Sequence, residues 1–106
     1  MSDARAIYKQ GFAHFAKGEH SEAIRLYRQA IEADGQLPIA WNGLSMALAQ
    51  SGDLDGAIEA AKKLIELEPD DPLSHTNLSR FYQQKGLIPE AEDEKALAMS
   101  LQMKRQ

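Results

Sequence analysis

Three short stretches restate one pattern along the chain: GEHSEAI at Gly18–Ile24, GDLDGAI at Gly52–Ile58 and GLIPEAE at Gly86–Glu92. Each stretch begins with Gly and carries Ala five residues later, and both residues recur at an interval of 34 positions. A fixed period of this length is the signature of stacked structural units, each of which buries its apolar face against its neighbours. The repeat therefore determines the fold class before any local motif does.

Shifting the chain by 34 residues aligns positions outside these stretches as well. Small residues coincide at Gly11, Ser45 and Ser79, and prolines coincide at Pro38 and Pro72. Apolar residues within each unit follow the 3.6-residue period of a helix, and no segment shows the sustained alternation of a strand. The sequence predicts an all-α solenoid of three stacked antiparallel hairpins, with helices over 3–16, 20–33, 38–50, 54–67, 72–85 and 89–104.

The recurring small residues have a structural explanation. The Gly that opens each stretch falls where the helical pattern breaks, and Gly adopts the left-handed conformation that follows a helix. The Ala of each stretch is expected to face the small residue of the preceding helix, so that the two backbones approach closely. A bulky side chain at either place should push the hairpin apart.

These residues resemble the tetratricopeptide repeat, a 34-residue helix–turn–helix unit, most fully in the pattern Trp41, Leu44, Ser45, Leu48, Gly52, Ala57 and Pro69. The resemblance implies one domain over residues 1–106 made of three units, at about 4–37, 38–71 and 72–106. Lys95 replaces a large apolar residue of the family pattern in the third unit, which fits a terminal unit with a more polar outer face.

Composition excludes several function classes. The net charge of -4 argues against nucleic acid as a partner, and residues 32–71 alone carry 9 acidic and 2 basic groups. We interpret this acidic third as solvated surface in preference to an acidic docking patch. The absence of Cys excludes disulfides and thiolate metal sites, and no apolar run is long enough for a membrane span. We expect a cytoplasmic protein, and the initial Met favours a whole chain over a piece of a longer array.

No motif for catalysis is present. The chain has no HExxH, no G-x-S-x-G and no glycine-rich phosphate loop. Helix packing accounts for His14 and His75, and His20 is expected in a turn. We therefore expect no enzymatic activity, no metal and no cofactor.

The resemblance implies a concave face, lined by the first helix of each hairpin, that holds a peptide or helix of a partner protein. The lining residues would be Arg5, Tyr8, Phe12, Asn42, Met46, Thr76, Asn77, Arg80 and Gln83. The aromatic and Met side chains are candidate anchors, the two Asn can bond a peptide backbone, and Arg80 can bind a carboxylate. The alternative is that Tyr8 and Phe12 only cover the open end of the first hairpin.

One specialised form of the family grips the acidic tails of heat-shock chaperones with Lys, Asn and Arg side chains. At the corresponding places this chain has Tyr8, Phe12, Gly43, Thr76 and Arg80, of which only Arg80 matches. A more hydrophobic ligand is therefore expected.

The last predicted helix suggests self-assembly as the alternative function. It carries more apolar residues than one intramolecular face can readily bury: Ala96, Leu97, Ala98, Met99, Leu101 and Met103. A two-fold dimer through Ala96, Met99 and Met103 would cover part of this set. In the other interpretation, some of these residues pack on helix 72–85 and the rest stay in solvent.

Overall fold

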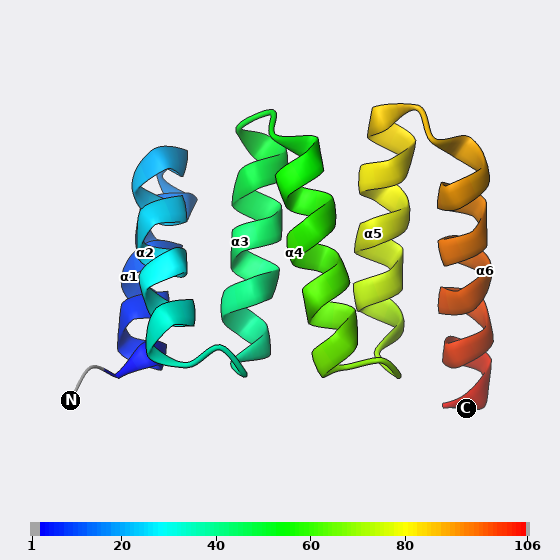
Figure 1. Cartoon of the computed structure of the whole chain (residues 1–106), viewed down its shortest axis with the longest axis horizontal. Coiled ribbons are helices and arrows are strands. Elements are labelled where there is room, and N and C mark those ends of the chain that lie inside the picture. The colour runs from blue at the N-terminus through cyan, green and yellow to red at the C-terminus, as the bar shows by residue number, and fades with distance from the viewer. Residues whose placement is uncertain (1–2, 106) are drawn as a thin grey trace.

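The computed structural model describes residues 3–105, which form six α-helices arranged side by side (Figure 1). The helices are α1 Ala4–Ala16, α2 His20–Ala33, α3 Pro38–Gln50, α4 Leu54–Leu67, α5 Pro72–Lys85 and α6 Ile88–Lys104. The predicted all-α fold is confirmed, and each predicted helix boundary lies within one residue of the observed one. The predicted start of helix 20–33 at His20 is observed, whereas the separate expectation that His20 lies in a turn was wrong, because its ring packs against Phe15 from the first position of α2.

The turn inside each hairpin depends on its glycine. Gly18, Gly52 and Gly86 have φ angles of 79°, 96° and 87°, in the left-handed region that other residues rarely adopt. A Cβ at any of the three would meet no atom within 4 Å, so the constraint comes from the backbone alone. The opening glycines of the repeated stretches therefore act as helix stops.

Helix starts are fixed by two other devices. Pro38 and Pro72 occupy the first positions of α3 and α5, where a missing N–H leaves no helical hydrogen bond unmade. Asp3, Asp53 and Asp71 cap α1, α4 and α5, because their carboxylates accept a hydrogen bond from a backbone N–H in the first turn. Residues at the helix ends therefore determine where these helices begin and end.

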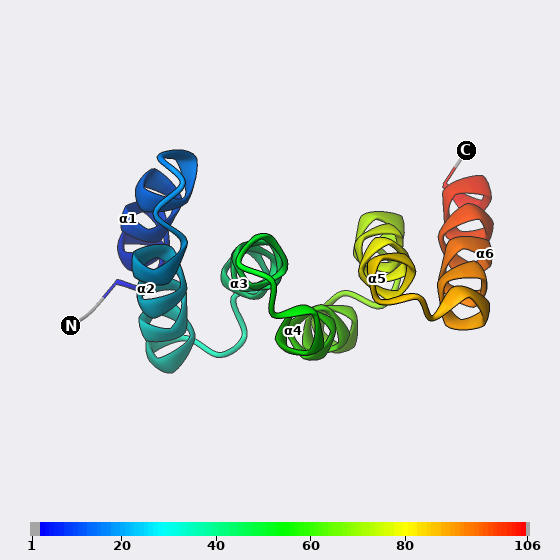
Figure 2. The same ribbon diagram turned by 90° about the horizontal axis from the view of Figure 1, so that it is seen from above.

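Seen from above, the first helices of the hairpins, α1, α3 and α5, lie along one side of the array, and α2 and α4 lie along the other (Figure 2). The molecule measures 39 × 28 × 19 Å, so the helices form one elongated row. Within residues 3–105, no helix is long and apolar enough to cross a membrane.

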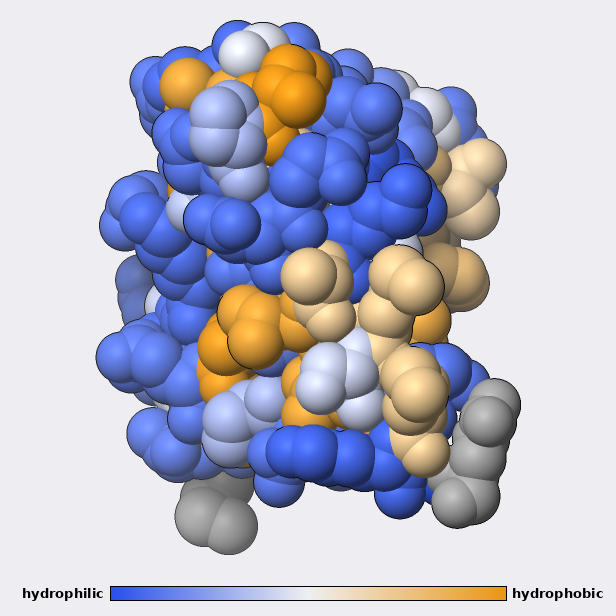
Figure 3. All heavy atoms as spheres, turned by 90° about the vertical axis from the view of Figure 1, so that its right-hand side faces the viewer, coloured by the Kyte–Doolittle hydropathy of each residue, from blue (hydrophilic) through white to orange (hydrophobic). Residues whose placement is uncertain are grey.

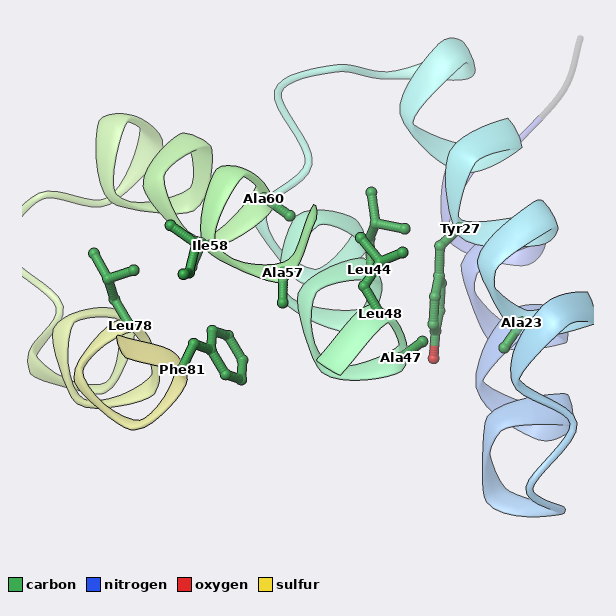
Figure 4. Close-up of a cluster of buried hydrophobic side chains, with 11 residues drawn as sticks. Ala23, Tyr27, Leu44, Ala47, Leu48, Ala57, Ile58, Ala60, Leu78 and Phe81 are labelled. Carbon is green, nitrogen blue, oxygen red and sulfur yellow. The ribbon is translucent and has the colours of Figure 1, made fainter. Parts of the chain in front are cut away.

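Tyr27 of α2 occupies the centre of the contact between the first two hairpins (Figure 4). Only 1% of this residue is exposed, and two glycines make room for its ring. A Cβ at Gly11 of α1 would lie 2.9 Å from the ring, and one at Gly43 of α3 would lie 2.8 Å from it. Both helices therefore approach the ring more closely than any side chain would allow.

The expected contact with the repeating Ala is observed for Ser79, whereas the hydroxyl of Ser45 bonds within its own helix. Ser45 is fully buried, and its hydroxyl donates to the backbone oxygen of Asn42 on its own helix at 2.8 Å. The Ser79 hydroxyl of α5 donates to the backbone oxygen of Ala91 on α6 at 2.7 Å. In the third hairpin, the small residue thus binds the very Ala that repeats in the opening stretches.

Candidate functional site

A hollow lies at the amino ends of α1, α3 and α5, and we call it the amino-end hollow. Its wall combines the first helices of all three hairpins with α4 and the preceding turns. The lining residues are Arg5, Leu37, Pro38, Ile39, Asn42, Leu64, Glu68, Asp71, Leu73, Ser74 and Asn77. Three of the nine predicted lining residues, Arg5, Asn42 and Asn77, are therefore brought together here.

Amide groups line the amino-end hollow beside apolar side chains. The Asn77 side-chain amide donates to the Asn42 side-chain oxygen at 3.3 Å, across the boundary between two units. This bond leaves the Asn42 amide with hydrogen-bond donors and the Asn77 oxygen with acceptor capacity. Arg5 contributes one positive charge, while Glu68 and Asp71 contribute two carboxylates to the same wall.

Sequence reasoning missed all the apolar members of this wall, of which Ile39 and Leu73 are the exposed ones. Leu73 is 68% exposed, which is unusual for a leucine on a packed helix, and Ile39 is also exposed. Both positions could have been identified from the 34-residue period, because they lie 34 and 68 residues after Arg5, a predicted lining residue. The repeat places all three residues at equivalent points of their helices.

Aromatic residues on α1 form the second part of the predicted surface. Tyr8 stacks on the buried ring of Tyr27 at a centroid distance of 5.6 Å, and Phe12 stacks on Tyr8 at 6.3 Å. Phe12 remains 53% exposed at the outer end of this stack. Met46 is half-buried and packs on the same core cluster as Tyr8. The α1 rings are thus held by the core at one end and open to solvent at the other.

The remaining predicted residues lie elsewhere. Thr76, Arg80 and Gln83 line a separate hollow between α5 and α6, together with Ser79, Ile88, Ala91, Glu92 and Lys95. The Thr76 hydroxyl donates to the Pro72 carbonyl of its own helix at 3.0 Å. The nine predicted residues therefore divide among the amino-end hollow, the α1 stack with Met46, and this third hollow.

The predicted dimer residues Ala96, Met99 and Met103 lie together on the outer side of α6, with Ser100 and Lys104. The burial of this helix agrees with the second interpretation, in which some of its apolar residues pack inside the molecule and the rest stay in solvent. Ala98 is buried and Leu101 is half-buried, whereas Leu97, Met99 and Met103 are exposed.

His75 has a different environment from the other two histidines. It is buried, with Nδ1 2.7 Å from a carboxylate oxygen of Glu94 and Nε2 3.2 Å from the Pro69 carbonyl oxygen. Both partners are acceptors, so both contacts are hydrogen bonds when both ring nitrogens carry a proton. This pair ties α5 to α6. Among residues 3–105, no group of three His, Cys, Asp or Glu side chains is placed to hold a metal ion.

Comparison with known proteins gives consistent matches. Two models of the tetratricopeptide repeat match residues 8–72 and 48–98. The TPR repeat-containing thioredoxin TTL4 of Arabidopsis thaliana is 30% identical over 86 residues, which make up 81% of this chain and 13% of that protein. This chain is thus similar to a small part of a much longer protein.

Solved structures share the fold over nearly the whole chain. A crystal structure of MamA matches with a TM-score of 0.94 and 29% identity, and covers 97% of this chain and 60% of that one. The second TPR of Spaghetti (RPAP3), solved with the HSP90 peptide SRMEEVD, matches with a TM-score of 0.86. Its identity is 20%, over 92% of this chain and 91% of that one, so this likeness concerns the fold alone. This chain spans less than two thirds of both TTL4 and MamA.

Proposed function

Because the chain belongs to the tetratricopeptide repeat family, we propose that it is a non-catalytic module that binds a peptide or helix of a partner protein. The ligand lies on the side of the array formed by α1, α3 and α5. It contacts the amino-end hollow and the α1 stack, and its anchoring side chains are apolar.

This proposal rests on exposed apolar side chains that lie beside amide groups with hydrogen-bonding capacity left over. Ile39 and Leu73 are exposed on the wall of the amino-end hollow, next to the paired side chains of Asn42 and Asn77. Apolar surface with a few placed hydrogen-bonding groups is the usual composition of a ligand site. A peptide can seat an aliphatic side chain on the former and bond its backbone to the latter.

The α1 stack extends the same surface. Arg5, Tyr8 and Phe12 are spaced by three and four residues, so they share one helix face that runs from the hollow to the exposed ring of Phe12. Burying Phe12 against a ligand would remove apolar area that the chain itself leaves in water. This continuity favours an extended or helical ligand over a small molecule.

The peptide bound to the RPAP3 domain is acidic, as its printed sequence SRMEEVD shows. This chain has the corresponding basic residue at Arg80 only, and its amino-end hollow carries Glu68 and Asp71. We therefore expect discrimination against acidic tails and preference for a ligand with apolar anchors.

Selection of random 12-residue peptides displayed on phage tests the proposal directly. A selected peptide is then titrated against the wild type and a Phe12→Ala, Leu73→Ala variant, with fluorescence anisotropy as the readout. Each truncated side chain should cost about 1.5 kcal/mol of binding, so the double variant should bind roughly a hundredfold more weakly.

Leu97→Ala is the matched control, because Leu97 is similarly exposed but lies on α6, away from the proposed surface. Its affinity for the selected peptide should equal that of the wild type, and circular dichroism should give all proteins the same helicity. Equal affinity of the double variant and the wild type would move the binding site off this side of the array.

A further inference from the structure

The C-terminal half of α6 presents apolar side chains to solvent (Figure 3). The helix buries its inner side through Ala91 and Ala98, which contact the rest of the molecule. Away from this inner side, Met99 is 59% exposed and Met103 is 71% exposed. Figure 3 shows the hydrophobic colours gathered over the C-terminal half of this helix. The chain thus displays two adaptable, apolar side chains that none of its described residues covers.

The exposed residues follow the spacing of a helix-pairing seam. Glu92, Ala96, Met99 and Met103 are separated by four, three and four residues, the alternation that keeps one helix against another over several turns. We call these four residues the α6 seam. A large and a small residue, Met99 and Ala96, lie at its centre, so a partner that offers the reverse order would interlock with it.

Charges beside the α6 seam have opposite sign at its two ends. Asp93 flanks the first turn of the seam and Lys104 flanks the last, and both side chains are exposed. Asp93 and Lys104 take part in none of the ion pairs within residues 3–105. An identical helix laid antiparallel would bring each acidic end beside a basic end, whereas a parallel one would bring like charges together.

We propose that the α6 seam is the contact for a second copy of this chain, paired antiparallel about a two-fold axis. Ala96 of one copy faces Met99 of the other, and the Glu92 methylenes lie against Met103. Asp93 of one copy forms an ion pair with Lys104 of the other, and the symmetry produces the pair twice. Size and charge are therefore both self-complementary in this one arrangement.

We expect the dimer to be weak because the α6 seam is short. The α6 seam covers residues 92–103, which is about 16 Å of helix at ~1.5 Å per residue. An interface of this length is smaller than the ~800 Å² per partner of standard stable complexes. We therefore expect a monomer–dimer equilibrium that responds to protein concentration over the range of about 10 µM to 1 mM.

Methionine methyl NMR on the wild-type protein provides the first test. On concentration from about 10 µM to 1 mM, the signals of Met99 and Met103 should shift together along one binding curve. Met46 is the internal control, because it packs on the core of the second hairpin and should not move. Concentration-independent signals of Met99 and Met103, with a monomeric mass by sedimentation, would overturn the proposal and leave the seam to a different partner.

Charge reversal tests the antiparallel arrangement. Asp93→Lys and Lys104→Glu alone each turn two attractive pairs into repulsive ones, and each should weaken dimerisation about tenfold. The double variant restores both pairs and should return to the wild-type dissociation constant. Single variants that dimerise as well as the wild type would exclude the antiparallel pairing.

Glu59→Lys and Lys62→Glu supply matched charge changes on the exposed surface of α4. Neither should change the dissociation constant, and far-ultraviolet circular dichroism should show the same helix content for all variants. A loss of dimerisation in these controls as large as that in the α6 variants would assign the effect to net charge and contradict the proposed pairs.

Discussion

Replacing Gly43 by Ala should destabilise the protein, although Ala normally stabilises a helix. Gly43 lies within α3, where the exchange alone would favour folding by about 1 kcal/mol. The added Cβ, however, would lie 2.8 Å from the nearest ring atom of Tyr27 and within 3.1 Å of two others. Contacts this short are not tolerated, so the ring or the helix must move.

The ring has little room to retreat. Tyr27 is almost fully buried, Gly11 approaches it from α1, and Tyr8 stacks on it at 5.6 Å. Overpacking of a well-filled core costs about 1–3 kcal/mol. Set against the helix-propensity gain, the expected net change is a loss of about 1 kcal/mol in the free energy of unfolding.

Urea denaturation followed by circular dichroism measures this loss as a lower midpoint, by roughly 0.5–1 M for a chain of this size. The same exchange in a Tyr27→Leu background should raise the midpoint, because the clash is gone and the propensity gain remains. Gly35→Ala is the control, since its Cβ would meet only one atom, a backbone oxygen at an ordinary 3.6 Å. A Gly43→Ala variant more stable than the parent with Tyr27 intact would refute the reasoning.

Two further predictions concern buried polar groups. His75→Ala should lower the free energy of unfolding by about 2 kcal/mol, because it leaves the Glu94 carboxylate and the Pro69 carbonyl without their hydrogen bonds. Urea denaturation midpoints measure this loss, and an unchanged midpoint would show that the pair does not tie α5 to α6. Burial, together with the neighbouring Tyr8, raises the pKa of Tyr27 to about 12, whereas the unfolded chain ionises near its ordinary value of 10.0. The resulting stability is complete below pH 10 and is lost as the pH rises from 10 to 12, by at most about 3 kcal/mol. Tyr27→Phe should lack this part of the alkaline loss in denaturation series from pH 9 to 12, and parallel curves for the two proteins would contradict the raised pKa.

Most of the backbone was predictable because its determinants are local. Gly52 stops a helix by its left-handed φ, Pro72 starts one, and Asp53 caps one, and each acts within a few residues of its own position. The 34-residue period then shows three times which residues share a structural role. For these reasons the helix boundaries predicted from the sequence lie within one residue of those observed.

The contacts between units were less predictable, because they depend on which side chains meet across helices. The Asn42–Asn77 bond joins residues 35 apart, one more than the period, so alignment by the repeat does not pair them. Gly43 occurs in one unit only, and from the sequence alone it is a residue that weakens a helix. Its role is clear only in the structure, where the Tyr27 ring lies against it. The His75–Glu94 pair likewise connects two helices through side chains that have no counterpart in the other units.

Tyr27 links the core to the proposed binding surface. Tyr27 sets the spacing of α1 and α3 through two glycines, and it also supports Tyr8, which in turn supports the exposed ring of Phe12. A displacement of Tyr27 must therefore move the outermost ring of the stack, since each ring rests on the next. The position of Phe12 is determined by packing in the interior, so core exchanges at Gly11 or Gly43 should alter the binding surface without touching it.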